Sequence, residues 1–531
     1  MKKQLLLLPG ILSLALSCHQ DPVTPELLPE YTSPEELSHG LIQLGDKLED
    51  PYTVDNMLNA LAAVYPTKAD RVDLAATDLY VRFLPKDDDQ LHTLEEAGLY
   101  LMDHPMDYAI LREGDYYQDP ELEEDQITWQ YAVVPHDFHF PKNIPVEVLD
   151  ECYIAEHAPV TRGLEDIDWD LVERESFRLT GNGEMLPALT KGGAVAPAGR
   201  ITIEDPSYNE GKPFGVSGVK VACNIFVKIA TTYTDRDGYY QMDKKFSGNP
   251  RYRLVFQNKK GFNIGFNFIL IPASVSTLGK AGPEGLDYNI DASFDNALFR
   301  RCTVNNAAYD YFSRCTESDL NITAPPSNLR IWIFPGLSSS STCMLRHGAL
   351  LEGSALDDLL KEYLGFSCMK IVEMFLPDLT IGTKQMDYRS IYSSVVHELA
   401  HASHYTQVGN EYWNPYIIYV IRSFLLEGGE PYGGGTGEDK GYCEIGEMWG
   451  YFMESTLEKD RYGGTLPSYG SEYWFKPDIF RYLYERGFSR HDLFRALKAD
   501  VTSTDDLKES LIGLYPEQEA VIRQTFSYYG K

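Results

Sequence analysis

The sequence predicts a multidomain α+β protein with an N-terminal α+β module, a central β-sandwich and a C-terminal α+β domain. Its 531 residues exceed what one compact core usually holds, since domains commonly span about 100–200 residues. The composition, 43% hydrophobic and 24% charged, is typical of folded globular chains. A Gly/Ala/Pro-rich segment at 192–199 separates the first two regions, so we expect domains at residues 35–190, 198–267 and 268–531.

The charge of the chain excludes some classes of partner. Lys and Arg number 47 and Asp and Glu number 79, which gives a net charge of −32. A surface of this sign repels nucleic-acid phosphates, and no basic run offsets it, so no nucleic-acid partner is expected. Direct binding to an anionic membrane surface is disfavoured for the same reason, which leaves a lipid anchor as the expected membrane attachment. Nothing in the sequence indicates an oligomer.

The first residues predict export. A basic start, Met1-Lys2-Lys3, precedes the apolar run Leu5–Leu16 and then Ser17-Cys18. This pattern is typical of a secretory signal over residues 1–18, and its apolar run is too short to span a membrane. The small residue directly before Cys18 resembles the lipobox of bacterial lipoproteins, which implies that Cys18 is lipidated and that residues 19–34 form a tether. An ordinary cleaved signal with a coincidental cysteine is the alternative.

The N-terminal domain has α+β patterning and no recognisable site residues. We expect helices at 35–48, 54–65 and 87–97, and strands at 78–84 and 129–134. The stretches YVRFLPKDDDQL and DPELEEDQITWQYAVV resemble the N-terminal part of surface lipoproteins of Gram-negative bacteria. That resemblance implies a lipid-anchored protein at the outer membrane or cell surface, on the periplasmic or extracellular face.

The central region alternates β-branched and aromatic residues between Gly-rich turns, which predicts a small β-sandwich. Its first strand is expected at 200–204. The order of its features resembles the carboxypeptidase-regulatory-like, transthyretin-type domain. Asp235-Arg236-Asp237-Gly238 invites a calcium interpretation, but Phe246 stands where an EF-hand loop needs Glu. We therefore predict a β-turn with positive φ at Gly238.

The seven cysteines after Cys18 are scattered and have no CxxC spacing, which argues against a zinc ribbon or a dense disulfide framework. Pairing of Cys302 with Cys315, or of Cys343 with Cys368, stays open. Most of these thiols are expected to be small buried apolar groups.

The chemistry of the chain is expected in the third domain, at His397-Glu398-Leu399-Ala400-His401. A continuous helix over Tyr392–Tyr405, stopped by Gly409, places His397 and His401 one turn apart on one side. Both imidazoles can then bind a single cation at about 2.0–2.1 Å. Glu398, offset by one residue, lies beside this cation and can take a proton from an activated water molecule.

A catalytic zinc ion needs a third protein ligand. His404 is too far along the helix axis from His397 to share one ion. The metzincin pattern fails because Gln407 occupies the position of the third histidine. A later helix offers Glu444, Glu447 and Glu454 instead, with Glu447 favoured and Glu444 open as the ligand.

Glu447-Met448-Trp449-Gly450 resembles the ligand segment of gluzincin-type zinc metallopeptidases. Together with the His397 motif, the resemblance implies a zincin-like domain that binds one Zn²⁺ per chain through His397, His401 and Glu447. It also implies an oxyanion-stabilising residue, for which Tyr442 is the candidate. Tyr451 stands where the thermolysin-type pattern has Asp, so the residue that orients the first histidine stays open.

Two further segments accompany this site. Pro377–Gly382, after an expected strand at 369–376, is predicted to be a strand beneath the active-site helix, of the kind that aligns an extended peptide. The glycine-rich segment 427–437 is either a mobile loop over the cleft or a plain connector.

The expected function is that of an exported, lipid-anchored zinc metallopeptidase, with endopeptidase favoured over exopeptidase activity. Its substrates would be extracellular proteins or glycoproteins. The alternative is a non-enzymatic surface protein that binds a glycan or protein and whose zinc is structural or absent. A third possibility keeps the peptidase and makes the N-terminal domain an inhibitory pro-segment.

Overall fold

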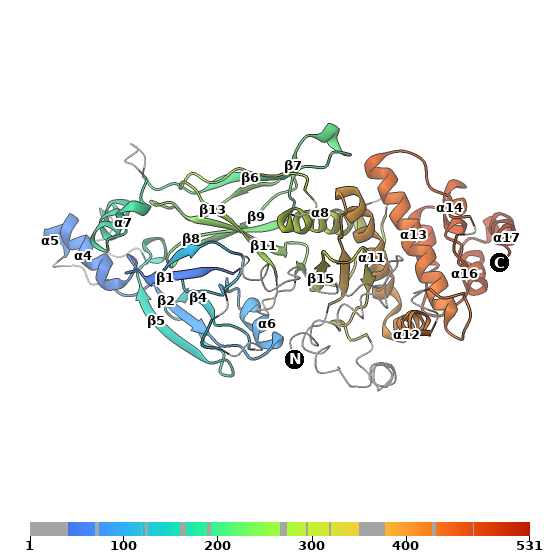
Figure 1. The fold of residues 1–531 in the computed structure, drawn as a ribbon, viewed down its shortest axis with the longest axis horizontal. Coiled ribbons are helices and arrows are strands. Elements are labelled where there is room, and N and C mark those ends of the chain that lie inside the picture. The colour runs from blue at the N-terminus through green and yellow to red at the C-terminus, as the bar shows by residue number, and fades with distance from the viewer. Residues whose placement is uncertain are drawn as a thin grey trace.

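The computed structural model is a mixed α/β, multidomain protein, as the sequence predicts (Figure 1). The signal segment, the tether, Cys18 and the expected strand at 369–376 lie outside the residues that the structure describes. The described residues are 41–69, 74–117, 119–122, 126–159, 166–187, 193–265, 273–293, 296–317, 320–349, 377–426, 432–470 and 472–531.

The N-terminal region contains two small antiparallel sheets. One pairs β1 with β3, and the other has β2 between β4 and β5. The strands expected at 78–84 and 129–134 and the helices expected at 54–65 and 87–97 are all present. The elements are β1 (Gln43–Lys47), α4 (Val54–Val64), α5 (Pro66–Ala69), β2 (Asp78–Phe83), α6 (Asp88–Glu96), β3 (Tyr108–Arg112), β4 (Gln130–Pro135), β5 (Val146–Cys152) and α7 (Trp169–Leu179).

The helix predicted at 35–48 is wrong over its described part. Residues 43–47 form strand β1 instead, and Leu44 pairs with Ile110 of β3. Helical periodicity in a short segment is a weak signal, and pairing with a distant strand overrides it here.

Two layers of strands form the central region (Figure 1). One sheet has the order β10-β6-β14, with β7 also paired to β6, and the facing strands β8, β9, β11 and β13 belong to a larger sheet. Gly238 has φ of 84°, as expected for the predicted turn, and an added Cβ there would lie 2.1 Å from the Ile201 carbonyl oxygen. The strands are β6 (Ala198–Ile203), β7 (Phe214–Gly215), β8 (Val219–Ile225), β9 (Lys228–Tyr233), β10 (Tyr239–Gln241), β11 (Arg251–Asn258), β13 (Val275–Lys280) and β14 (Tyr288–Ile290).

The larger sheet extends from the central region into the C-terminal region, because β12 pairs with β15 through backbone hydrogen bonds. Its order is β16-β17-β15-β12-β11-β8-β9, and β12, β15 and β17 run parallel. Residues 379–382 form a strand, as predicted, but the strand at the end of this order is β16, antiparallel to β17. The additional strands are β12 (Phe262–Ile264), β15 (Leu329–Phe334), β16 (Ser341–Thr342) and β17 (Leu379–Gly382).

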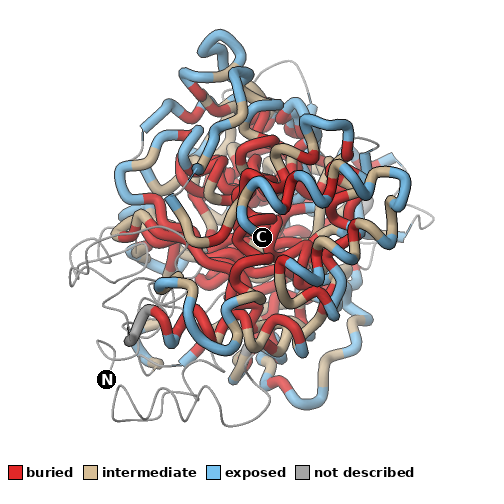
Figure 2. Tube along the Cα trace, turned by 90° about the vertical axis from the view of Figure 1, so that its right-hand side faces the viewer, coloured by how far each residue is buried: buried red, intermediate tan, exposed pale blue. Residues whose placement is uncertain are grey.

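Helices complete the C-terminal region. α8 and α11 lie beside the sheet, and α13 follows them, with the last helices beyond it (Figure 1). Buried residues fill the centre of this arrangement (Figure 2). The helices are α8 (Ala297–Cys315), α11 (Tyr388–Val408), α12 (Asn410–Leu426), α13 (Lys440–Tyr462), α14 (Asp478–Glu485), α15 (Arg490–Arg495), α16 (Thr504–Leu514) and α17 (Glu519–Tyr528).

The cysteines of the described segments are free and buried, so Cys302 and Cys315 form no disulfide. Cys343 is also free, and Cys368 lies outside the described residues. Within those same segments, no helix combines the length and the apolar character that crossing a membrane requires.

A buried ion-pair network joins the N-terminal region to the sandwich. Lys228 of β9 is 1% exposed, and its Nζ lies 2.8 Å from Glu173 Oε2 of α7 and 2.7 Å from Glu156 Oε1. Glu173 also accepts a hydrogen bond of 2.9 Å from the Tyr52 hydroxyl. Because Glu173 is buried as well, its charge depends on Lys228 for compensation.

We expect Lys228→Met to lower the free energy of unfolding by about 3–5 kcal/mol, because it leaves buried Glu173 without its cation. Denaturant unfolding monitored by circular dichroism measures this change. Lys212→Met is the matched control, since the exposed Lys212–Glu210 pair should contribute less than about 1 kcal/mol. Equal effects of the two substitutions would contradict the role assigned to Lys228.

Candidate metal centre

Helix α11 carries the histidine motif and is longer than predicted. It begins after Asp387, whose side chain accepts a hydrogen bond from the backbone N–H of Ser390, and it ends at Gly409 with φ of 78°, the predicted stop. His397 and His401 lie one turn apart on it, with their Nε2 atoms 3.1 Å from each other. Both side chains are buried.

Helix α13 brings Glu447 to the two histidines. Glu447 Oε2 lies 3.4 Å from His397 Nε2, and Oε1 lies 3.6 Å from His401 Nε2. Ligands bound tetrahedrally at about 2.0–2.1 Å are separated by about 3.3–3.4 Å, which is close to these three distances. His397, His401 and Glu447 therefore form a buried group that can bind a metal ion.

Glycines allow the two helices to approach this closely. A Cβ added at Gly450 would lie 2.8 Å from His397 Nε2 and 2.9 Å from His401 Nε2. One turn earlier, a Cβ at Gly446 would lie 3.2 Å from the Tyr416 ring. Any larger side chain at position 450 would enter the space between the imidazoles and α13.

Three neighbouring side chains contact the metal-binding group, two of them through hydrogen bonds. The His397 Nδ1–H donates to Glu454 Oε2 at 2.9 Å, since a carboxylate can only accept, so Nε2 is the ring nitrogen that faces Glu447 and would coordinate a metal ion. The Tyr416 hydroxyl of α12 donates to Glu447 Oε1 at 2.6 Å. The Tyr451 ring packs edge-to-face on His397, with a centroid distance of 4.7 Å.

The charges of the group are strongly coupled. Burial by itself lowers the pKa of His397, but hydrogen bonds from its ring to Glu447 and Glu454 outweigh burial and raise that pKa to about 10. Burial alone would raise the pKa of Glu447, yet His401 and His397 hold it well below its ordinary value. Glu447 is thus a carboxylate anion that needs positive charge beside it, which a metal cation can supply.

Glu398 points its carboxylate toward the sheet. The Thr342 hydroxyl of β16 lies 2.7 Å from Glu398 Oε2 and 2.8 Å from the Glu398 carbonyl oxygen. Burial raises the pKa of Glu398. His397 and His401 act in the opposite direction, but their effect is smaller, so the pKa stays above its ordinary value. Strand β16, at one end of the order of the large sheet, therefore holds the Glu398 side chain in position through Thr342.

The other residues considered from the sequence lie elsewhere. Glu444 is ion-paired with Lys531 and lies 3.5 Å from the Thr504 hydroxyl, so its carboxylate is engaged away from the histidines. Tyr442 packs its ring on Tyr412 at 4.8 Å, and the tyrosine hydroxyl that contacts Glu447 is that of Tyr416. Whether Tyr442 has the expected oxyanion role stays a prediction.

His404 is buried beside the group without joining it. Its ring contacts Tyr412 and Trp413, and neither ring nitrogen has a hydrogen-bond partner among the described residues. Burial, together with the nearby His401, lowers the pKa of His404 to about 3. This histidine is therefore neutral in the folded protein.

Sequence reasoning missed Thr342 and Tyr416, for which the sequence carries no signal. Glu454 was among the glutamates that the sequence offered, and it follows Glu447 by seven residues on the same face of α13, but its contact with His397 was not assigned.

A scan against protein-family models and a search of curated proteins give no match to this chain.

We expect Gly450→Ala to abolish stoichiometric metal binding, because the added methyl group would lie within 3 Å of both coordinating nitrogens. Metal content of the purified protein, measured by inductively coupled plasma mass spectrometry, tests this. Gly513→Ala on α16 is the matched control, since its added Cβ meets no atom within 4 Å. Full metal content in Gly450→Ala would contradict the position assigned to the ion.

The lowered pKa of His404 predicts acid sensitivity. The unfolded chain binds a proton at this histidine below about pH 6.5, whereas the folded protein does so only near pH 3, so stability falls as the pH drops through this window. Between pH 6.5 and 5 the loss is about 2 kcal/mol. Denaturant unfolding with chelator present should show this loss in the wild type and less of it in His404→Met. Parallel pH profiles would contradict the assignment.

Proposed function

We propose that this protein is a zinc metallopeptidase that hydrolyses peptide bonds of extracellular proteins or glycoproteins. The observation that carries the proposal is the group of two imidazoles and one carboxylate with Glu398 held beside it. Two histidines and a glutamate are a donor set that zinc takes in catalytic sites, where three protein ligands leave a position for water or substrate. The motif's resemblance to gluzincins supports the same reading.

A zinc ion bound here would supply Lewis-acid activation of a water molecule and of the scissile carbonyl. Glu398 accepts the proton of the attacking water and then delivers it to the leaving amine. Thr342 holds the Glu398 carboxylate in position, and Glu454 fixes the tautomer of His397 through Nδ1. Tyr416 orients Glu447 by donating to its Oε1.

Strand β16 is the element best placed to align a peptide. Among the described strands it ends the order of the large sheet, and its Thr342 contacts Glu398, the proposed base. An extended substrate added alongside this strand would bring its main chain next to Glu398.

Export and lipid attachment at Cys18 form part of the proposal, with the N-terminal pattern as support. A peptidase placed in this way at the outer membrane or cell surface of a Gram-negative bacterium meets extracellular substrates. The net charge of −32 favours approach of basic or neutral ones at low salt.

One observation favours a second candidate, a surface binding protein with a structural metal. His397, His401 and Glu447 are each at most 1% exposed, a degree of burial that a structural site would share. A structural site closes with a fourth protein ligand, whereas a catalytic one admits water.

Glu398→Gln separates the two candidates. If Glu398 is the base, peptide-library digestion by the metal-loaded variant should fall by about 10²–10⁴-fold while metal content stays unchanged. The exposed Glu472→Gln serves as the control and should keep full activity. Undiminished hydrolysis by Glu398→Gln would remove Glu398 from the mechanism, and no hydrolysis by metal-loaded wild type would favour the binding protein.

A further inference from the structure

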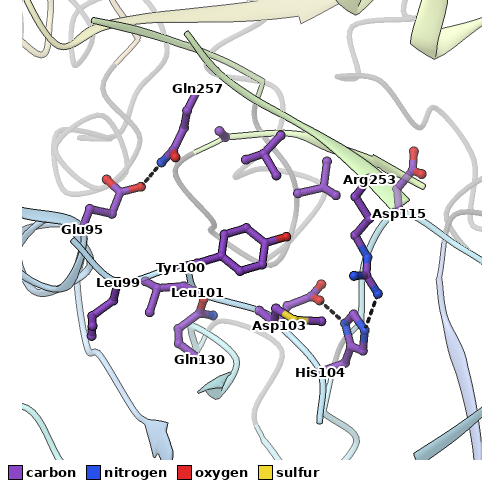
Figure 3. Close-up of a pocket in the computed structure, with 14 residues that line it drawn as sticks. Glu95, Leu99, Tyr100, Leu101, Asp103, His104, Asp115, Gln130, Arg253 and Gln257 are labelled. Atoms are coloured by element: carbon purple, nitrogen blue, oxygen red, sulfur yellow. Dashed lines mark hydrogen bonds and ion pairs between the residues drawn. The ribbon is translucent and has the colours of Figure 1, made fainter. Parts of the chain in front are cut away.

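A cavity lies far along the chain from the metal group, between the N-terminal region and the large sheet (Figure 3). Its walls come from the segment 99–104, from β4 and from one face of β11 and β13. The volume is about 50 Å³. None of its lining residues belongs to α11, α12 or α13, so its chemistry is independent of the proposed peptidase site.

Arg253 is the lining residue that gives one end of this cavity a positive charge. It lies on β11, is 3% exposed, and lines the cavity wall. Its Nη1 donates to Asn224 Oδ1 at 2.7 Å, and its Nη2 donates to His104 Nε2 at 3.1 Å. Among the described residues it forms no direct ion pair with a carboxylate. A buried guanidinium that is not paired with a carboxylate is stabilised by binding an anion.

Three carboxylates also line the cavity, those of Glu95, Asp103 and Asp115, and each is already engaged. Glu95 accepts a hydrogen bond from the Gln257 side chain at the end of the cavity away from Arg253 (Figure 3). Asp115 pairs with Arg301 at 2.9 Å, so its charge is compensated. Asp103 accepts from His104 Nδ1 at 2.6 Å and from the Tyr117 backbone N–H at 2.6 Å. The His104 ring thus bridges Asp103 and Arg253 through one hydrogen bond on each side, as Figure 3 shows.

The rest of the cavity suits a short apolar group. Val255 and Ala273 pack with Val275 and the Tyr100 ring in one small apolar cluster. In Figure 3 the Tyr100 hydroxyl points toward the side on which Arg253 lies. A cationic end and an apolar wall together match a molecule that has a carboxylate at one end and a few carbons at the other.

We propose that this cavity binds the carboxylate group of a small organic acid, with the carboxylate on Arg253 and the apolar part against Val255 and Ala273. One water molecule needs about 10–15 Å³ of cavity volume, so a cavity of about 50 Å³ holds about three to five groups of the size of a water molecule. Propionate has five non-hydrogen atoms and is the matching probe. A free acid of this size and the carboxyl terminus of a peptide share the recognised chemistry.

Propionate and propionamide, which have the same shape and differ in charge, provide the test on the wild-type protein. At constant ionic strength, titration followed by protein NMR should give a dissociation constant at least tenfold lower for propionate. Arg253→Gln should remove this preference, whereas Arg200→Gln on β6, which does not line the cavity, should retain it. Equal binding of propionate and propionamide, or an unchanged preference in a folded Arg253→Gln, would overturn the proposal. The wild-type comparison holds even if Arg253→Gln does not fold.

A second comparison identifies the source of the acid. N-acetyl-dialanine with a free carboxylate is titrated beside its amide. Tighter binding of this peptide acid than of propionate would assign the site to peptide carboxyl termini, and weaker binding would assign it to free small acids. Either result supports a carboxylate site, whereas binding of neither acid overturns it. These titrations need no metal and no hydrolysis, so failure of the peptidase proposal would leave their result unaffected.

Discussion

The burial of the Glu447 carboxylate against two imidazoles is the interaction around which the C-terminal region is arranged. A buried charge is costly unless it is paired, so the pairing requires α13 to lie almost in contact with α11. Gly446 and Gly450 permit this approach because they present no side chain toward α11 and α12. Glu454 and Tyr416 then hold His397 and Glu447 in fixed orientations from the outside. The arrangement of ligands that can bind a metal ion therefore follows from the close approach of two helices.

The large sheet positions Glu398 through Thr342 of β16. β16 is joined through β17 and β15 to the strands of the central region, so Thr342 and Glu398 are tied to the same framework as the sandwich. The central and C-terminal regions also share the backbone hydrogen bonds between β12 and β15. The Glu398 side chain, the base of the proposed mechanism, is thereby positioned by a rigid element.

The sequence allowed much of the site to be predicted, because His397, Glu398 and His401 are neighbours on one helix and Gly409 ends it. Local spacing cannot reveal partners that come from other elements, and this is why Tyr416 and Thr342 were not foreseen. The same limit explains the error at residues 43–47, where pairing with a distant strand decides the structure. Arg253 and His104, which are 149 positions apart, also meet only through the tertiary fold.

The most direct test of the account is the metal stoichiometry of residues 19–531, measured for the wild type, His397→Ala, Glu447→Ala and Glu444→Ala. The account predicts about one metal ion per chain in the wild type and in Glu444→Ala, whose native carboxylate pairs with Lys531. It predicts loss of the ion in the other two variants. A wild type that binds no metal after reloading, or a Glu447→Ala variant that keeps its ion, would contradict it.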